Sequence, residues 1–89
     1  MPSISYFYGI TIKMYHNEIH HRGRPHFHAG YGEDEAIVDI ESLTIIAGAL
    51  PPRGRRLVTE WARAHRAELR ENWVRARSHQ PLIPIDPLR

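Results

Sequence analysis

The sequence predicts an α+β domain, in which a three- or four-stranded antiparallel β-meander packs against a long or kinked amphipathic helix and is followed by an extended proline-rich tail. Two observations carry this prediction: apolar residues recur with period 2 through residues 1–50, and with period 3.6 beyond Pro51. A chain of 89 residues has room for one hydrophobic core. We therefore expect a single domain over 1–89, with a sheet half at 1–50, a helical half at 51–79 and the tail at 80–89.

Four segments of the sheet half alternate between apolar and polar residues. The first runs from Ile4 to Met14, where Gly9 predicts a bulge or bend. The polar stretch 15–24 predicts an exposed loop that ends at Pro25. The pattern resumes at 26–31, 36–40 and 44–50, and the intervening residues 32–35 and 41–43 have the composition of turns.

Pro51-Pro52 ends the strands and suits a helix start, because the first helical turn needs no N–H from proline. A continuous helix to Ser78 would be about 40 Å long, against the ~30 Å diameter typical of a small domain. We therefore predict a break near His65–Ala67. Three prolines in the tail exclude a helix there. The apolar stripe that predicts the helix contains Leu57, Val58, Trp61, Ala62, His65, Leu69, Trp73 and Ala76.

The composition excludes several classes of protein. The chain has no cysteine, so disulfide frameworks and thiolate-based metal or redox sites are excluded. No signal peptide and no stretch of ~20 apolar residues is present, which predicts a cytoplasmic protein without membrane contact. The formal net charge of +2 divides unevenly, with three basic against six acidic residues in 1–50 and nine against four in 51–89. The basic helical half indicates a polyanionic or acidic partner.

His26-Phe27-His28 is the first candidate for chemistry. If residues 32–35 form a four-residue connection, the register places His28 opposite Asp39 and His26 opposite Glu41. A carboxylate beside an imidazole prepares it for acid–base catalysis near neutral pH. We expect His26 and His28 to act as acid and base, Asp39 to orient His28, and Arg24 with Arg22 to hold a phosphate. These roles would suit a metal-independent ribonuclease without a cofactor.

Two alternatives compete for the same histidines. In the first alternative, His26 and His28 belong only to a solvent-facing polar stripe, in which a His–Asp pair stabilises the hairpin. Alternatively, His26 and His28 would bind Zn²⁺ together with a carboxylate and a histidine of the loop. No HExxH motif supports the metal site, and the prediction is that no metal is bound. The loop histidines are His16, His20 and His21.

A row of arginines in the helical half is the second candidate. At ~100° per residue, the spacings of 7, 3, 4 and 7 residues place them on one basic stripe, away from the apolar face. Such a stripe would bind an RNA backbone or an acidic protein. The alternative is a solvated face, partly neutralised by Glu60 and Glu71. The arginines are Arg56, Arg63, Arg66, Arg70 and Arg77.

The sequence also resembles a known family along nearly its whole length. Its most specific elements are Arg24-Pro25-His26-Phe27-His28 and the strand Ala36-Ile37-Val38-Asp39-Ile40. Phe7-Tyr8-Gly9-Ile10, Glu71-Asn72-Trp73 and Ile85-Asp86-Pro87-Leu88 agree as well. On these motifs the chain resembles the bacterial domain-of-unknown-function family 4160.

The resemblance implies the toxin-like member of a toxin–antitoxin pair. Its partner would be a protein of domain-of-unknown-function family 2442, which would bind and neutralise it. The leading hypothesis is thus a toxin that cleaves RNA through His26 and His28. The second hypothesis is a non-enzymatic module that binds a protein or nucleic acid through the basic helix. The third hypothesis is a homodimer formed through an exposed strand edge or an overhanging helix.

Overall fold

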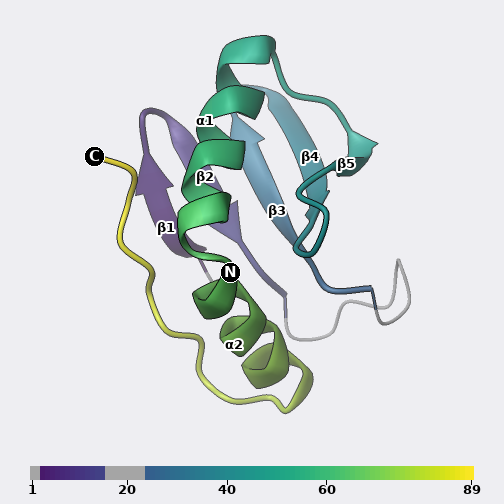
Figure 1. Cartoon of the computed structure of the whole chain (residues 1–89), viewed down its shortest axis with the longest axis vertical. Helices are drawn as coiled ribbons and strands as arrows, with labels where there is room; N and C mark the ends of the chain where they lie inside the picture. The colour runs from purple at the N-terminus through teal and green to yellow at the C-terminus, as the bar shows by residue number, and fades with distance from the viewer. Residues whose placement is uncertain (1–2, 16–23) are drawn as a thin grey trace.

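The computed structural model describes residues 3–15 and 24–89, which form an antiparallel sheet and two helices (Figure 1). The five strands follow one another in the order β1-β2-β3-β4-β5, so each strand pairs with its neighbour in sequence. This is the predicted α+β meander with more strands than the three or four expected. The elements are β1 (Ser3–Phe7), β2 (Ile10–Lys13), β3 (His26–Tyr31), β4 (Asp34–Asp39), β5 (Ile45–Gly48), α1 (Pro52–Ala64) and α2 (Arg66–Arg77).

The additional strand arises at Gly9, where the predicted bulge or bend is a tight hairpin turn rather than a bulge. Tyr8 and Gly9 have positive φ values of 50° and 81°, and Phe7 pairs with Ile10 across them. A two-residue turn with positive φ at both positions matches the twist of a hairpin. Residues 4–14 therefore fold into the β1–β2 hairpin, and the irregularity in their pairing lies between Ser3 and Ser5.

The β3–β4 turn is also shorter than predicted. It contains only Gly32 and Glu33, and Gly32 has the positive φ of 63° that the first position of a type II′ turn requires. Pairing consequently begins at Tyr31 and Asp34, and Phe27 lies opposite Val38 rather than Ile40. Since the register differs by two residues, every side chain keeps its predicted face while its partner changes.

The helical half forms two helices that meet at His65, in the region predicted for a break. His65 has φ −121° and ψ 25°, and its N–H donates to the carbonyls of Trp61 and Ala62 at the end of α1. The long axis of the molecule measures 33 Å, so a straight helix of about 40 Å would have extended beyond it. Figure 1 shows α1 crossing one face of the sheet and α2 lying beyond the end where β3 begins.

The core lies between α1 and the face of the sheet that α1 covers. Trp61 is fully buried there, with its ring centroid 5.3 Å from that of Phe7 and 6.0 Å from that of Phe27. The expectation that Trp61 belongs to the core is confirmed. Neither helix in the described part of the chain is long and apolar enough to cross a membrane.

Residues 80–89 contain neither helix nor strand and run back along the β1 side of the molecule (Figure 1). Asn72 anchors this tail by donating to the carbonyl of Ile83 and accepting from its N–H, both at 2.8 Å. The Trp61 indole donates to the carbonyl of Asp86, and the N–H of Ile85 donates to the carbonyl of Ile4. The tail thereby joins α1 and α2 to the edge strand β1.

Candidate functional site

The face of the sheet opposite α1 is polar and carries the first candidate site. On adjacent antiparallel strands, directly opposed residues point to the same face. Lys13 of β2 is opposite His28 of β3, and Thr11, Gly30 and Glu35 form the neighbouring row across β2, β3 and β4. An ammonium, an imidazole and a carboxylate are thus gathered over three adjacent strands.

Gly30 leaves a depression in the middle of these residues, which we call the Gly30 hollow. A Cβ atom added at Gly30 would meet no atom within 4 Å. The hollow has a volume of about 420 Å³, within the range of roughly 300–1,000 Å³ common for small-molecule sites. It is lined by Tyr6, Gly9, Thr11, Lys13, His28, Gly30, Gly32, Glu33, Asp34 and Glu35.

His28 and Glu35 are the titratable pair of the Gly30 hollow. The His28 Nδ1 atom lies 3.5 Å from Oε2 of Glu35, and the carboxylate is the more exposed partner, at 59% against 12%. The ring of Tyr15 meets the His28 ring edge-on, with centroids 4.6 Å apart, and limits its rotation. The hollow therefore offers a proton acceptor, a proton donor and a cation to one bound group.

The predicted pairing of His28 with Asp39 is wrong, and so is that of His26 with Glu41. Ile37 lies opposite His28, and Asp39 lies opposite His26, because the β3–β4 turn has two residues instead of four. The sequence pattern also misses Glu35, because its composition predicts a turn, whereas in the structure this residue belongs to β4. The Gly32-Glu33 dipeptide was the signal in the sequence that could have located Glu35. A two-residue turn at this dipeptide places Glu35 opposite Gly30, on the same face of the sheet as His28.

Asp39 organises the turn between β4 and β5. Its Oδ1 accepts from the N–H groups of Glu41 and Ser42, at 2.7 and 2.9 Å, and its Oδ2 accepts from Nε of Arg24. Burial raises the pKa of Asp39, but the N–H of Ser42, the Arg24 side chain and the N–H of Glu41 outweigh it and hold the pKa below its ordinary value. Arg24 and Asp39 thus form an ion pair with each other.

His26 lies in the interior, at the end of the sheet that α2 covers. Its side chain is 2% exposed, its Nδ1 donates to the carbonyl of Arg24 at 2.7 Å, and its ring centroid lies 4.9 Å from that of Trp73. The His26 and His28 rings are neighbours, with centroids 5.7 Å apart. Of the two, His28 lines the Gly30 hollow, whereas His26 is not among its lining residues.

The break at His65 divides the predicted arginine row. Three of its members on α2 contact the protein itself: Arg66 donates to the carbonyl of Ile40, Arg70 binds Glu41 through two hydrogen bonds of 2.9 and 2.6 Å, and Arg77 lies over the Trp73 ring. The hydrogen bond with Arg70 lowers the pKa of Glu41 and raises that of Arg70. A single stripe of five arginines is therefore not formed.

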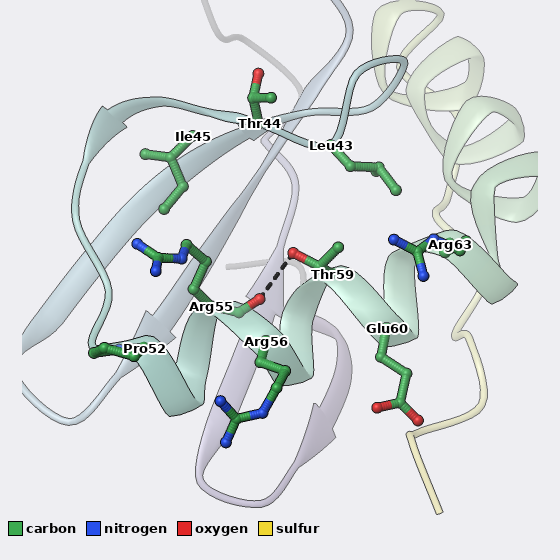
Figure 2. Close-up of a pocket in the computed structure, with 9 residues that line it drawn as sticks. All are labelled: Leu43, Thr44, Ile45, Pro52, Arg55, Arg56, Thr59, Glu60 and Arg63. Atoms are coloured by element: carbon green, nitrogen blue, oxygen red, sulfur yellow. Dashed lines mark hydrogen bonds between the residues drawn. The ribbon is translucent and has the colours of Figure 1, made fainter.

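Arg56 and Arg63 remain together on α1 and line a second depression. This depression, which we call the α1 groove, lies between α1 and the segment that leads into β5 (Figure 2). Its volume is about 770 Å³. Arg55, which sequence reasoning missed, also lines it. The complete lining is Leu43, Thr44, Ile45, Pro52, Arg55, Arg56, Thr59, Glu60 and Arg63.

Within residues 3–15 and 24–89, the structure contains no cluster of three or more His, Asp or Glu side chains that could hold a metal ion. The alternative metal site also used His16, His20 and His21, and the phosphate site used Arg22. These four residues lie outside the described part of the chain.

Comparison with protein families matches residues 9–74 to a domain of unknown function, DUF4160. The chain belongs to the DUF4160 family. This confirms the resemblance seen in the sequence. The DUF4160 match begins at the β1–β2 turn and ends within α2, so it includes Lys13, His28, Gly30 and Glu35 as well as α1. No curated protein and no solved structure matches the chain.

Proposed function

We propose that the Gly30 hollow is the active site of a metal-independent ribonuclease, and that this DUF4160 protein is the toxin of a bacterial toxin–antitoxin module. The observation that carries the enzymatic part is the contact of 3.5 Å between His28 and Glu35, with Lys13 opposite His28 on the next strand. The site differs from the one expected from the sequence, because Glu35 takes the place of His26 and Lys13 takes that of Arg24.

Cleavage of RNA without a metal needs one group that removes a proton and one that supplies a proton. Glu35, as the exposed carboxylate, takes the proton of the ribose 2′-hydroxyl, whose oxygen then forms a bond to phosphorus. His28 donates a proton to the 5′-oxygen as the bond from that oxygen to phosphorus breaks, which yields a 2′,3′-cyclic phosphate. Lys13 stabilises the negative charge that develops on the phosphoryl oxygens.

The contact between the two groups also closes the proton cycle. After one turnover Glu35 holds the proton from the 2′-hydroxyl, and His28 has lost its own. A small movement of either side chain from their separation of 3.5 Å brings the two groups within hydrogen-bond distance, and the proton then returns from the carboxyl group to the imidazole. The enzyme is then ready for another substrate without a further reagent.

The charge around the Gly30 hollow governs how a strand of RNA enters. Glu33 and Asp34 line the β3–β4 side and repel phosphates, whereas Lys13 attracts them from β2. The strand therefore approaches along β2, and its affinity falls as salt screens Lys13.

Cleavage of a labelled single-stranded RNA, followed on a denaturing gel in the presence of a chelator, tests the enzymatic part. Gly30→Val fills the hollow with a residue that suits a strand, and Glu35→Gln removes the base. Both should lower the cleavage rate by about 100-fold or more while the fold persists. Glu71→Gln, on α2 and outside both the Gly30 hollow and the α1 groove, is the matched control. A parent without activity, or a fully active Gly30→Val variant, would contradict the proposal.

The toxin role is tested separately by growth. Expression of the parent should arrest a bacterial culture, and co-expression of a family 2442 protein from the same genome should restore growth. A parent that does not slow growth would remove the toxin assignment but would leave the cleavage result unaffected.

The second candidate is a non-enzymatic binding module, which the arginine side chains of the α1 groove favour. It is distinguished by binding without turnover, because charge reversal at Arg55 and Arg63 would then abolish binding whereas Glu35→Gln would not.

A further inference from the structure

We propose that the α1 groove binds an extended segment of a partner protein in which acidic and apolar residues alternate. The proposal is independent of the Gly30 hollow, which lies on the opposite face of the sheet. It rests on the composition of the groove, on the charge of its arginines and on the position of β5.

The groove has an apolar side that can accept alternate side chains of a peptide. Leu43 and Ile45 are half-buried on the segment that enters β5, and Pro52 begins α1 below them. A segment in extended conformation presents every second side chain to one surface. Its apolar residues would cover Leu43 and Ile45 and remove them from water.

The opposite wall of the α1 groove is positively charged. Among the residues that the structure describes, Arg55, Arg56 and Arg63 line it, together with one acidic residue, Glu60. Within the described residues none of these three arginines forms an ion pair, unlike Arg24, Arg70 and Arg75. Figure 2 shows Arg55 and Thr59 pointing from α1 toward residues 43–45, whereas Arg56 and Glu60 point away from them. Carboxylates of a bound segment would complement this charge.

The combination of an apolar side and a positively charged side in the α1 groove favours a peptide over a nucleic acid as its ligand. Proteins that hold single-stranded RNA usually stack its bases on aromatic side chains, and none of the described residues that line the α1 groove is aromatic. RNA also has no apolar side chains to cover Leu43 and Ile45. In addition, β5 is the last strand of the sheet, so its outer edge offers main-chain groups with which an extended peptide can pair.

Fluorescence anisotropy with two labelled probes tests the proposal. The first probe is a short peptide of alternating glutamate and valine, and the second is oligouridylate. The peptide should bind saturably, and the double variant Arg55→Glu with Arg63→Glu should weaken its binding by about tenfold or more. Arg53→Glu is the matched control, since Arg53 is exposed on α1 but does not line the groove.

Two further peptides separate the contributions of charge and of apolar contact. Replacing glutamate by lysine should abolish binding, and replacing valine by serine should weaken it. The proposal fails if the peptide does not bind, if Arg53→Glu weakens binding as much as the double variant does, or if the double variant loses oligouridylate while retaining the peptide. Circular dichroism of each variant identifies losses caused by unfolding.

Discussion

Arg24 donates from Nε to Oδ2 of Asp39 and thereby joins the residue that precedes Pro25 to the end of β4. Asp39 in turn holds the β4–β5 turn through two N–H groups, and the neighbouring Glu41 binds Arg70 of α2. One carboxylate therefore connects the entry to β3 with the turn on which α2 rests.

This relationship predicts a loss of stability in acid. The pKa of Asp39 is lower in the folded protein than in the unfolded chain, so the unfolded state binds more protons as the pH falls. The contribution of Asp39 is complete above about pH 5 and is lost as the pH falls through the lowered pKa. Asp39→Asn should lower the free energy of unfolding by about 1 kcal/mol at pH 7, because Arg24 is half exposed and its attraction is screened.

Urea unfolding at a series of pH values between neutrality and pH 2 checks this prediction. The difference between the parent and Asp39→Asn should shrink toward zero in acid. Because Glu41 also has a lowered pKa, the same series in a Glu41→Gln background isolates the part that belongs to Asp39. A difference that is independent of pH would contradict the account.

The two histidines should respond differently to substitution. His26→Ala removes a buried ring that packs on Trp73 and should cost about 2–4 kcal/mol of stability. His28→Gln should change stability by less than about 1 kcal/mol and abolish RNA cleavage. Thermal unfolding and cleavage assays, performed below both melting temperatures, separate the two effects. A stable, inactive His26→Ala variant would return His26 to the catalytic site.

Gly48 and Gly30 form a matched pair of strand glycines. Gly48 has φ 74°, and a Cβ atom there would lie 2.2 Å from the carbonyl oxygen of Glu35. Gly48→Ala should therefore lower stability by more than about 2 kcal/mol. Gly30→Ala meets no neighbour and should raise stability by up to roughly 0.5–1 kcal/mol, because alanine loses less conformational freedom on folding. Denaturant unfolding of both variants provides the comparison, and equal effects would be inconsistent with it.

Asn72 should control the attachment of the tail. Asn72→Ala leaves the N–H and the carbonyl of Ile83 without their partner and should cost about 2–3 kcal/mol. Amide exchange at Ile83 and Ile85 should accelerate before exchange in the sheet does. Val74→Ala is the control, because Val74 is exposed on the same helix. Unchanged exchange at Ile83 would show that other contacts are sufficient to hold the tail.

The end of α2 offers a stabilising substitution. His79 has φ 56°, while Gln80 donates to the carbonyl of Arg75 and His79 to that of Ala76, which is the pattern of a Schellman motif. Glycine adopts this conformation without strain, so His79→Gly should raise stability by about 0.5–1 kcal/mol. Ser78→Gly, at a negative φ, should lower it. The denaturant midpoint measures both, and a decrease for His79→Gly would refute the assignment.

Much of the fold was predictable because hydrophobic periodicity determines which side chains face the core. The alternation of Phe27 and Ala29 with His26 and His28 identified the faces of β3 correctly, and the period of 3.6 located the helical half and its break. Turn lengths were not predictable in the same way. Tyr8 is an unusual residue at positive φ, so the β1–β2 turn lacked the Asn-Gly or Asp-Gly signal.

The candidate site depended on those turn lengths. Asp34 and Glu35 have the composition of a turn, yet they extend β4, because Gly32-Glu33 suffices to reverse the chain. Because the turn is two residues shorter than predicted, Ile37 and not Asp39 lies opposite His28. The arginine row failed for another reason: its geometry assumed one helix axis, and α1 and α2 have separate axes. Local hydrophobic patterns thus predicted which face of a strand or helix each side chain occupies. Which residues lie opposite one another depended instead on the lengths of the turns and on the break between the helices.

The ion pair between Arg70 of α2 and Glu41 of the β4–β5 turn makes the stability of this protein depend on which salt is present. Arg70 and Glu41 are both half exposed, so chloride at high concentration screens their attraction and loosens this junction. Sulfate screens it as well, but it also strengthens the burial of the apolar core around Trp61. Chloride should therefore lower the stability of this junction, whereas sulfate should offset the same loss by strengthening the core.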